Sequence, residues 1–175
     1  RQGIADAVEH LSALGHRRIG FLGGPGYLDS SQRRMAAFKE GAARAALSDH
    51  PAIESDYTVQ GGYFACAKLL SRGKVTAIVS SNDLMAIGAL HCAYDRGLAV
   101  PESLSVVGFD DIVFAQYTQP ALTTVAVPRK EIGRLAFETI AHMHKDPSRP
   151  GVEHIAKTRL VVRQSTSRPS IKYED

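Results

Sequence analysis

The sequence has little cysteine, only two residues among 175. That is too few for the disulfide framework on which many small secreted domains depend. Cys66 and Cys92 both lie in stretches with a helical pattern. We therefore expect two buried free thiols in a reducing compartment.

Long apolar runs and a dominant charge are also absent. No run reaches about 18 residues, the length of a candidate membrane-spanning helix, and no signal-peptide pattern occurs. The net charge is only +3, without a dense stripe of Lys and Arg, so the chain lacks the electrostatic signature of nucleic-acid binding. With 44% hydrophobic and 22% charged residues, the composition is ordinary for a globular protein. The length fits one domain or two small lobes.

The usual motifs of enzymes and metal sites are missing as well. The seven histidines are scattered, and His142 and His144 do not have the H-E-x-x-H spacing. No G-x-S-x-G occurs, and Asp110 and Asp111 could face a cation but lack a third ligand. Since no nucleophile, base and orienting group occur as a set, we expect no enzyme activity, no metal and no cofactor.

What the sequence does contain is an alternation of apolar strands and amphipathic helices. Continuous apolar strands are typical of a sheet covered on both faces, and the connections exceed the dozen residues that parallel pairing needs. The predicted fold class is α/β with a doubly wound parallel sheet. The predicted strands are 17–22, 52–55, 75–81 and 104–109, and the predicted helices are 4–14, 30–48, 61–72 and 82–97.

Several details of these helices can be predicted. Gly15 is placed as a C-cap, and Ser30 and Ser31 are N-cap candidates for the second helix. The apolar spacing predicts two inward faces. These are Met35, Phe38 and Ala42 in the second helix, and Phe64, Ala67 and Leu70 in the third.

The pattern changes after Asp111. Residues 121–127 are predicted to be extended, and Pro128 opens a helix over 128–144, because proline suits the first helical position. A break follows at 146–151, then a strand over 154–165 and a polar tail over 168–175. The apolar face predicted for the helix comprises Ile132, Leu135, Ala136, Ile140 and Met143.

The glycine-rich stretch from Gly20 to Arg34 could be a nucleotide loop or a simple turn. Gly24 and Gly26 match the start of a dinucleotide fingerprint, but Asp29 replaces its third glycine and Glu54 lies too far along to be its acid. A P-loop is also excluded, because Val75 follows Gly73-Lys74. The stretch is therefore not expected to bind a nucleotide.

Polar side chains follow the predicted strands, at the edge where open α/β sheets bind ligands. They are Ser30, Arg34, Tyr57, Asn82 and Asp110. A guanidinium, an amide, a carboxylate, a hydroxyl and an aromatic ring suit a small ligand with several hydroxyl groups. Each residue also has a structural alternative. Asn82 and Ser30 could be helix caps, Asp110 part of a turn, Arg34 a surface charge and Tyr57 a residue at the rim of the core.

Six segments, taken in order, resemble the effector-binding domain of the LacI/GalR family of bacterial transcription regulators. They are "AVEHLSALGHRRIGFLGGP" (7–25), "SSQRRMAAFKEG" (30–41), "AIVSSNDLMAIGAL" (77–90), "GLAVPESLSVVGFDD" (97–111), "PALTTVAVPRKEIGRLAFETI" (120–140) and "TRLVVRQST" (158–166). The resemblance covers nearly the whole chain. It implies the type I fold of periplasmic binding proteins, in which two lobes clamp an effector and the chain crosses between them three times.

The resemblance also implies a division of the chain. Residues 1–126 would form the C-terminal lobe, 127–156 a segment of the N-terminal lobe, 157–170 a final strand back in the first lobe, and 171–175 a tail. The DNA-binding head and most of the N-terminal lobe would lie upstream, so this chain is not expected to bind an operator by itself. Without its lobe, the apolar face of helix 128–144 should repack, pair with another chain or be loosely held.

The family's site residues carry over by position. Arg34, Asn82 and Asp110 match its main effector contacts, Ser30 and Tyr57 match more variable ones, and Arg129 matches a hinge position that sometimes touches the ligand. The residues that match positions near the family's dimer surface are Ile87, Leu90 and Tyr117, for which the alternative is a core role.

The implied protein is a cytoplasmic, homodimeric regulator that senses a small, sugar-like effector and contacts DNA only through its missing head. A solute-binding protein of a transport system is the alternative with the same architecture. An enzyme on a doubly wound sheet is the third possibility.

Overall fold

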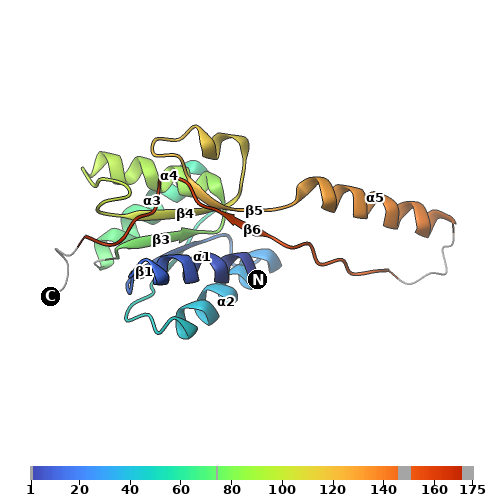
Figure 1. Ribbon diagram of the computed structural model, residues 1–175, viewed down its shortest axis with the longest axis horizontal. Coiled ribbons are helices and arrows are strands. Elements are labelled where there is room, and N and C mark those ends of the chain that lie inside the picture. The colour runs from blue at the N-terminus through green and yellow to red at the C-terminus, as the bar shows by residue number, and fades with distance from the viewer. Residues whose placement is uncertain (1, 74, 146–150, 171–175) are drawn as a thin grey trace.

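A single six-stranded sheet organises the molecule, which was studied as a computed structural model describing residues 2–73, 75–145 and 151–170 (Figure 1). The strand order is β2-β1-β3-β4-β5-β6. The first five strands pair in parallel, and β6 runs antiparallel to β5. The α/β class and the doubly wound parallel sheet predicted from the sequence are thereby confirmed. The strands are β1 (Ile19–Gly23), β2 (Ala52–Glu54), β3 (Ala77–Ser80), β4 (Ser105–Asp110), β5 (Thr123–Ala126) and β6 (Arg159–Val161).

Two layers of helices cover the two faces of the sheet. Helices α1 (Gln2–Ala13) and α2 (Asp29–Arg44) pack on one face, and α3 (Val59–Arg72) and α4 (Asp83–Asp95) pack on the other. Neighbouring strand residues point to opposite faces, so Phe21 joins the α1–α2 core and Leu22 the α3–α4 core. Every residue of β1 and β3 is buried, which explains their uninterrupted apolar sequence.

The closest helix contact joins α3 and α4 through two glycines. A Cβ atom at Gly62 would collide with the Met85 backbone, and one at Gly88 would collide with the carbonyl oxygen of Val59. The two backbones therefore approach more closely than any side chain would permit. Cys66 and Cys92 lie one turn beyond these glycines as buried free thiols, as the sequence predicts.

Two local predictions are wrong. Helix α2 begins at Asp29, so neither Ser30 nor Ser31 is its N-cap; Leu28 holds that position without a side-chain hydrogen bond. On α3 the inward face is Gly62, Ala65, Cys66 and Leu69, whereas Phe64 is 61% exposed. The reason is the glycine contact with α4, which rotates α3 so that small residues face inward. Ala67 and Leu70 are half-buried at the edge of that core.

The second helix and the strand–helix junctions otherwise follow the sequence. Phe38 and Ala42 are buried and Met35 packs against the same core. Asn82 is the N-cap of α4, where its side chain accepts a hydrogen bond from the Met85 amide. The closing strand is shorter than predicted, three residues within 154–165. The predicted break at 146–151 and the end of the tail fall largely on 146–150 and 171–175, outside the described residues.

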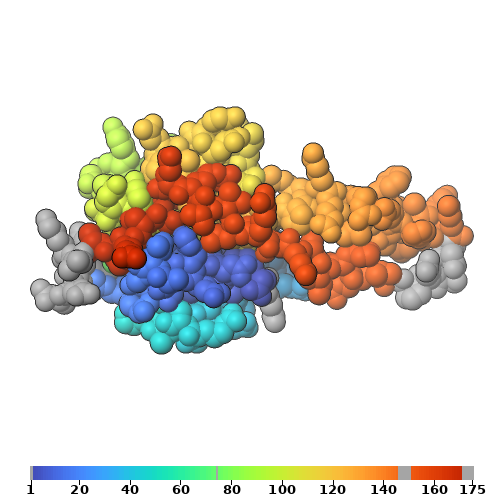
Figure 2. Space-filling model, in the orientation of Figure 1, coloured from blue at the N-terminus to red at the C-terminus, as the bar shows by residue number. Residues whose placement is uncertain are grey.

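Helix α5 (Arg129–Lys145) projects from the end of the sheet, and residues 151–158 run back beside it. Figure 2 shows these two segments as an arm beside the body of the molecule. No residue of α5 is buried. Of its predicted apolar face, all but Met143 lines a hollow of about 350 Å³ together with Val152, His154 and Ala156. The helix has not repacked on the sheet, so pairing with another chain and loose attachment are the expectations that stay open.

The glycine contact between α3 and α4 yields a stability prediction. Gly88→Ala should lower the free energy of unfolding by about 2–3 kcal/mol, because the added methyl group forces two backbones apart. Gly133→Ala is the control, since no atom lies within 4 Å of a Cβ built there. It should leave the free energy unchanged or raise it by up to about 1 kcal/mol through helix propensity. Equal urea midpoints for the two variants would contradict the assigned packing.

Candidate functional site

The candidate site lies where β1, β3 and β4 end. Leu22 of β1 pairs with Ser80 of β3, and Val79 pairs with Val107, so β4 extends beyond its neighbours to Asp110. The segments that follow these strands therefore meet at one edge of the sheet. Residues 55–57, after β2, lie beside them because Gly23 pairs with Glu54.

Arg34 connects three of these segments. Its Nη1 donates a hydrogen bond to the carbonyl oxygen of Ser81 at 3.0 Å, and its Nη2 lies 3.9 Å from Asp110 Oδ1. The guanidinium carbon also lies 4.4 Å from the centre of the Phe109 ring and 6.0 Å from that of Tyr57, within the range of a cation–π contact. Arg34 is thus half-buried and bound to other residues of the site, so it is not a solvated surface charge.

Both polar atoms of the Asn82 side chain make a hydrogen bond within the protein. Its Oδ1 accepts the Met85 amide at 2.9 Å as the cap of α4, and its Nδ2 donates to the carbonyl oxygen of Tyr57 at 3.0 Å. The helix-cap role considered for Asn82 from the sequence is therefore confirmed. The second bond also fixes the loop after β2 against the start of α4.

Tyr57 combines an unusual backbone with an unpartnered hydroxyl. Its φ is +68°, a conformation that bulky residues rarely adopt. The ring packs on Gly24, where a Cβ atom would collide with it. Among the described residues, the Tyr57 hydroxyl and the buried Ser81 hydroxyl have no hydrogen-bond partner. Both oxygens are buried, so they are unsatisfied polar groups at this edge of the sheet.

The glycine-rich loop between β1 and α2 is held by hydrogen bonds within the protein. Glu54 Oε1 accepts the Gly26 amide at 2.6 Å, and Gln32 Nε2 donates to the Gly26 carbonyl oxygen at 2.7 Å. Gly24 makes room for the Tyr57 ring. The loop thus turns the chain into α2 and supports the aromatic side of the site.

Asp110 and Asp111 are held in strained backbone conformations, with φ of +111° and +52°. Both guanidinium nitrogens of Arg129 brace them, with bonds of 2.8 Å and 2.7 Å to their carbonyl oxygens. Burial raises the pKa of the Asp110 carboxyl, and the nearby Arg34 and Arg129 oppose that rise. Arg129, expected as a possible ligand contact at the hinge, uses these two nitrogens to fix the turn that presents Asp110.

Ser30 is exposed in the first turn of α2, four residues before Arg34. Residues at this spacing share one helix face. The structure therefore joins Arg34, Tyr57, Asn82 and Asp110 by direct contacts, and Ser30 belongs to the group only by its place on the helix. Within the described part of the chain, no group of three or more His, Cys, Asp or Glu residues could hold a metal ion.

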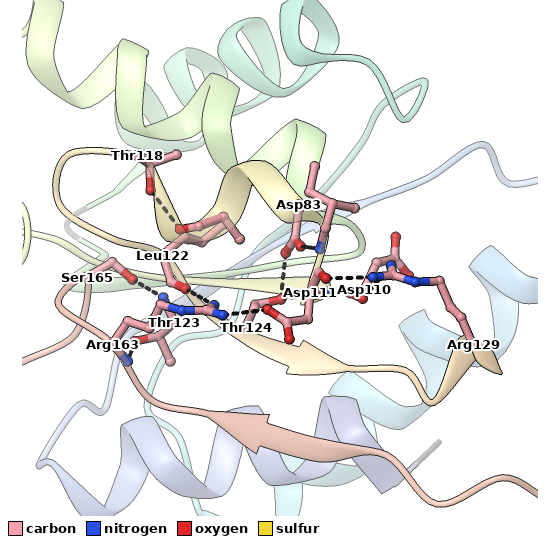
Figure 3. A network of polar contacts seen from close by, with 12 residues as sticks. Asp83, Asp110, Asp111, Thr118, Leu122, Thr123, Thr124, Arg129, Arg163 and Ser165 are labelled. Atoms are coloured by element: carbon pink, nitrogen blue, oxygen red, sulfur yellow. Dashed lines mark hydrogen bonds and ion pairs between the residues drawn. The ribbon is translucent and has the colours of Figure 1, made fainter. Parts of the chain in front are cut away.

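Sequence reasoning missed Asp83, which is fully buried at the start of α4 (Figure 3). Its carboxylate accepts hydrogen bonds from the Thr124 hydroxyl at 2.5 Å and from the Ile112 amide at 2.8 Å. It also packs on Gly108, where a Cβ atom would collide with it. Arg163, also missed, pairs with Asp111 at 2.6 Å and donates to the Leu122 carbonyl oxygen at 2.8 Å. An acid directly after an N-cap was the one available signal for Asp83.

The three dimer-surface candidates line one hollow of about 500 Å³ between α4 and the loop after β4. Leu90 is buried and also belongs to the core, Ile87 is half-buried, and Tyr117 is 76% exposed. The core alternative thus describes Leu90 in this chain but not Tyr117. Tyr94 and Phe114, both exposed, extend the apolar lining.

Comparison with known proteins identifies the class. Residues 8–166 match the family of periplasmic binding protein-like domains. The probable HTH-type transcriptional repressor ExuR of Bacillus subtilis (strain 168) is 35% identical over 175 positions, which cover 96% of this chain and 51% of ExuR. The CelR–cellobiose complex superimposes with a TM-score of 0.90 at 29% identity, covering 94% of this chain and 51% of CelR. The lac repressor dimer bound to operator and an anti-inducer superimposes with a TM-score of 0.88 at 29% identity, covering 95% of this chain and 58% of the repressor.

The chain therefore belongs to the periplasmic binding protein-like family. More narrowly, it is an effector-binding domain of the LacI/GalR type. It spans about half the length of the relatives it matches, and those relatives are transcription regulators, not enzymes. No helix in the described part of the chain is long and apolar enough to cross a membrane.

The buried carboxyl of Asp83 predicts a pH dependence of stability. Burial raises its pKa from 3.8 to about 6; the bonds from Thr124 and Ile112 oppose the rise, and the nearby Asp110 and Asp111 add to it. Because the folded-state pKa is the higher one, the folded protein binds this proton more tightly than the unfolded chain does. Its stabilising contribution is complete below about pH 4 and is lost as the pH rises through about 6, on the order of 3 kcal/mol in all.

Urea unfolding of the wild type and of Asp83→Asn between about pH 4 and about pH 7 measures this contribution. The wild type should lose more stability than the variant as the pH rises, whereas Asp29→Asn, which alters an exposed carboxylate, should follow the wild type. The raised pKa of Asp110 acts in both proteins and cancels in the comparison. Parallel curves for wild type and Asp83→Asn would refute the assignment.

Proposed function

We propose that this chain is the effector-sensing and dimerisation module of a LacI-type transcription regulator, with a sugar or a related polyhydroxy metabolite as its effector. The observation that carries the proposal is the position of Arg34, between the Ser81 carbonyl, the Asp110 carboxylate and the Phe109 ring. Such a fork of donors beside a carboxylate and aromatic faces suits a ligand that offers hydroxyls on its rim and C–H bonds on its faces.

The charges around the site support an uncharged ligand. Three arginines and three aspartates lie at this edge of the sheet. Arg34 is paired with Asp110 and Arg163 with Asp111. Arg129 bonds to the backbone of the 110–111 turn, and Asp83 is buried nearby. A site that is nearly neutral gains little from a strongly charged ligand. The cellobiose bound by CelR agrees with a neutral sugar.

The proposed division of the chain explains the exposed α5 arm. In this proposal residues 1–126 and 157–170 form the C-terminal lobe, 127–156 belong to a second lobe, and 171–175 are a tail. The arm leaves the first lobe at Val127 and Pro128, beside the candidate effector site. Its apolar face would be covered by the rest of that second lobe, which would close over the effector.

The mechanism we propose is linkage between effector binding and the geometry of a dimer. An effector shifts the population of two states only to the extent that it binds one more tightly. Effector contacts from Arg34, Asn82, Asp110, Ser30 and Tyr57 would favour the closed state. The dimer surface would pass this change to DNA-binding heads outside the chain, and DNA would be contacted only through those heads.

The effector prediction is tested first by a thermal-shift screen of the full-length protein against cellobiose, D-ribose, hexoses, phosphosugars and nucleosides. A true effector raises the melting temperature, and the increase grows with the logarithm of one plus the ratio of its concentration to its dissociation constant. Asp110→Ala should then weaken binding of the best sugar at least about tenfold by calorimetry, because a buried charged hydrogen bond is lost. Asp29→Ala, at an exposed carboxylate, is the control, and unchanged affinity in Asp110→Ala would remove the site.

The dimer prediction concerns Tyr117. Tyr117→Asp puts a charge on the apolar hollow shared with Ile87 and Leu90 and should raise the dimer dissociation constant at least about tenfold, because a charge buried without a partner is costly. Tyr27→Asp changes a tyrosine of similar exposure, 84%, in the glycine loop and should leave the dimer intact. Sedimentation velocity over a range of concentrations decides between these outcomes. A dimer undisturbed by Tyr117→Asp would show that the surface lies elsewhere.

A further inference from the structure

Two segments of this lobe each begin at a candidate effector residue and end at the candidate dimer surface. The α4 segment, residues 82–90, starts with Asn82 and reaches Ile87 and Leu90 on the hollow. The loop segment, residues 110–117, starts with Asp110 and reaches Phe114 and Tyr117 on the opposite wall of that hollow. The two surfaces are therefore connected twice by short stretches of chain.

Asp83 joins the two segments near their starts. It follows Asn82 directly, and its Oδ2 accepts the Ile112 amide of the loop segment at 2.8 Å. Its Oδ1 accepts the Thr124 hydroxyl of β5 at 2.5 Å, and the carboxylate is pressed against Gly108 of β4. Figure 3 shows the Asp83 carboxylate bonded to Thr124, with Asp110 and Asp111 nearby. It has no exposed surface, so it touches neither an effector nor a partner subunit.

The loop segment beyond Ile112 holds itself together. The Ala115 amide donates to the Ile112 carbonyl oxygen, and the Leu122 amide donates to that of Ala115. The Thr118 hydroxyl bonds to the carbonyl oxygens of Ala115 and Pro120. Because of these bonds, a displacement of Ile112 carries the wall that bears Phe114 and Tyr117 with it.

At neutral pH, above its pKa of about 6, Asp83 presents an ionised carboxylate to this junction. Both its partners, an amide N–H and a hydroxyl, can donate, and a carboxylate only accepts. An asparagine amide of the same shape has one accepting oxygen and an NH₂ donor, and the Thr124 hydroxyl can turn to accept from that donor. The bond from the Ile112 amide then goes to an uncharged oxygen. A hydrogen bond to a charged group is also stronger than one between neutral groups.

We propose that Asp83 is the positioning residue that couples the effector residues to the dimer surface, by holding the α4 segment and the loop segment in one fixed relation. The inference rests on the proposed function of the two surfaces. In this arrangement, closure of the second lobe over Asn82 and Asp110 moves both walls of the hollow as one body, and loss of the carboxylate lets the loop wall move independently.

Two variants separate this role from a general loss of stability. Asp83→Asn disturbs the bond to Ile112, whereas Thr124→Val removes the other partner of the same carboxylate and leaves that bond in place. The Thr124 hydroxyl reaches the loop segment only through a long contact, 3.4 Å, from the Asp111 amide. Both variants weaken the hydrogen bonding of the same buried side chain, and Thr124→Val also gives up the long contact from the Asp111 amide.

Amide hydrogen exchange of the full-length protein tests the junction without any ligand. In the wild type the Ile112 amide should exchange slowly for a loop position. Asp83→Asn should accelerate exchange over 112–118 by about tenfold, as expected for loss of a charged hydrogen bond, and Thr124→Val should not. Fast exchange of Ile112 in the wild type would overturn the proposal even if Asp83→Asn failed to fold.

Dimer dissociation measured by sedimentation tests the coupling. Asp83→Asn should raise the dissociation constant about tenfold, with Thr124→Val within about twofold of wild type. Cellobiose at saturation, or D-ribose if cellobiose does not bind, should shift the wild-type constant. That shift should shrink at least about threefold in Asp83→Asn and persist in Thr124→Val.

The outcomes separate the two proposals. Equal losses of dimer affinity in Asp83→Asn and Thr124→Val, or none in either, would overturn the role of Asp83 while leaving the sensing function intact. A wild type that is monomeric, or that binds none of the sugars, would instead contradict the proposed function. In that case the exchange rates over 112–118 still decide whether Asp83 holds the loop segment.

Discussion

The parallel pairing of β1, β3 and β4, buried on both faces, determines where the polar chemistry of this lobe can lie. Their register brings Ser80 level with Leu22 and lets β4 continue to Asp110. The first residues after β1 and β3 and the last of β4 are consequently neighbours, although 57 positions separate Gly24 from Ser81 and 29 separate Ser81 from Asp110. Arg34 can reach both Ser81 and Asp110 only because of this register. A slip of one residue would turn the core side chains of a strand to the other face, so the hydrophobic core fixes the site.

The site is also the place where the backbone is least relaxed. Four non-glycine residues in the described part of the chain have a positive φ, and three of them, Tyr57, Asp110 and Asp111, belong to the site. Conformations of this kind cost free energy and persist where surrounding contacts enforce them. Those contacts can be named here: Gly24 and the Asn82 amide act on Tyr57, and Arg129 and Arg163 act on the aspartate pair. The polar groups are thus positioned before any ligand arrives, which reduces the ordering cost of binding.

The parts of this structure that could be predicted are those that follow from local pattern. Buried strands, their helices and the cap at Asn82 are encoded within a few residues of each position, and the sheet class follows from their order. The inward face of α3 was mispredicted because a tertiary contact decides it: the glycine packing between α3 and α4 turns Phe64 outward. The role of Asp83 could not be predicted from the sequence because tertiary contacts define it as well. Its partners at 108, 112 and 124 come from three other segments, and no spacing in the sequence brings them together.

Residues 110 and 111 also lie beside the two strands that connect the sheet to the α5 arm. Strand β5 leads out to α5 and β6 leads back, and the two strands pair side by side. Arg129, just beyond the exit, holds the carbonyl oxygens of the aspartate pair, and Arg163, just past β6, holds the Asp111 carboxylate. A rotation of the α5 arm about Val127 and Pro128 must therefore either carry the 110–111 turn with it or break the bonds from Arg129. Asp111 is in turn one residue from Ile112, which Asp83 fixes. The candidate effector residue Asp110 and the loop of the candidate dimer surface thus share one short stretch of chain, and the base of the α5 arm is bonded to it through Arg129. This is the physical reason to expect that they respond together.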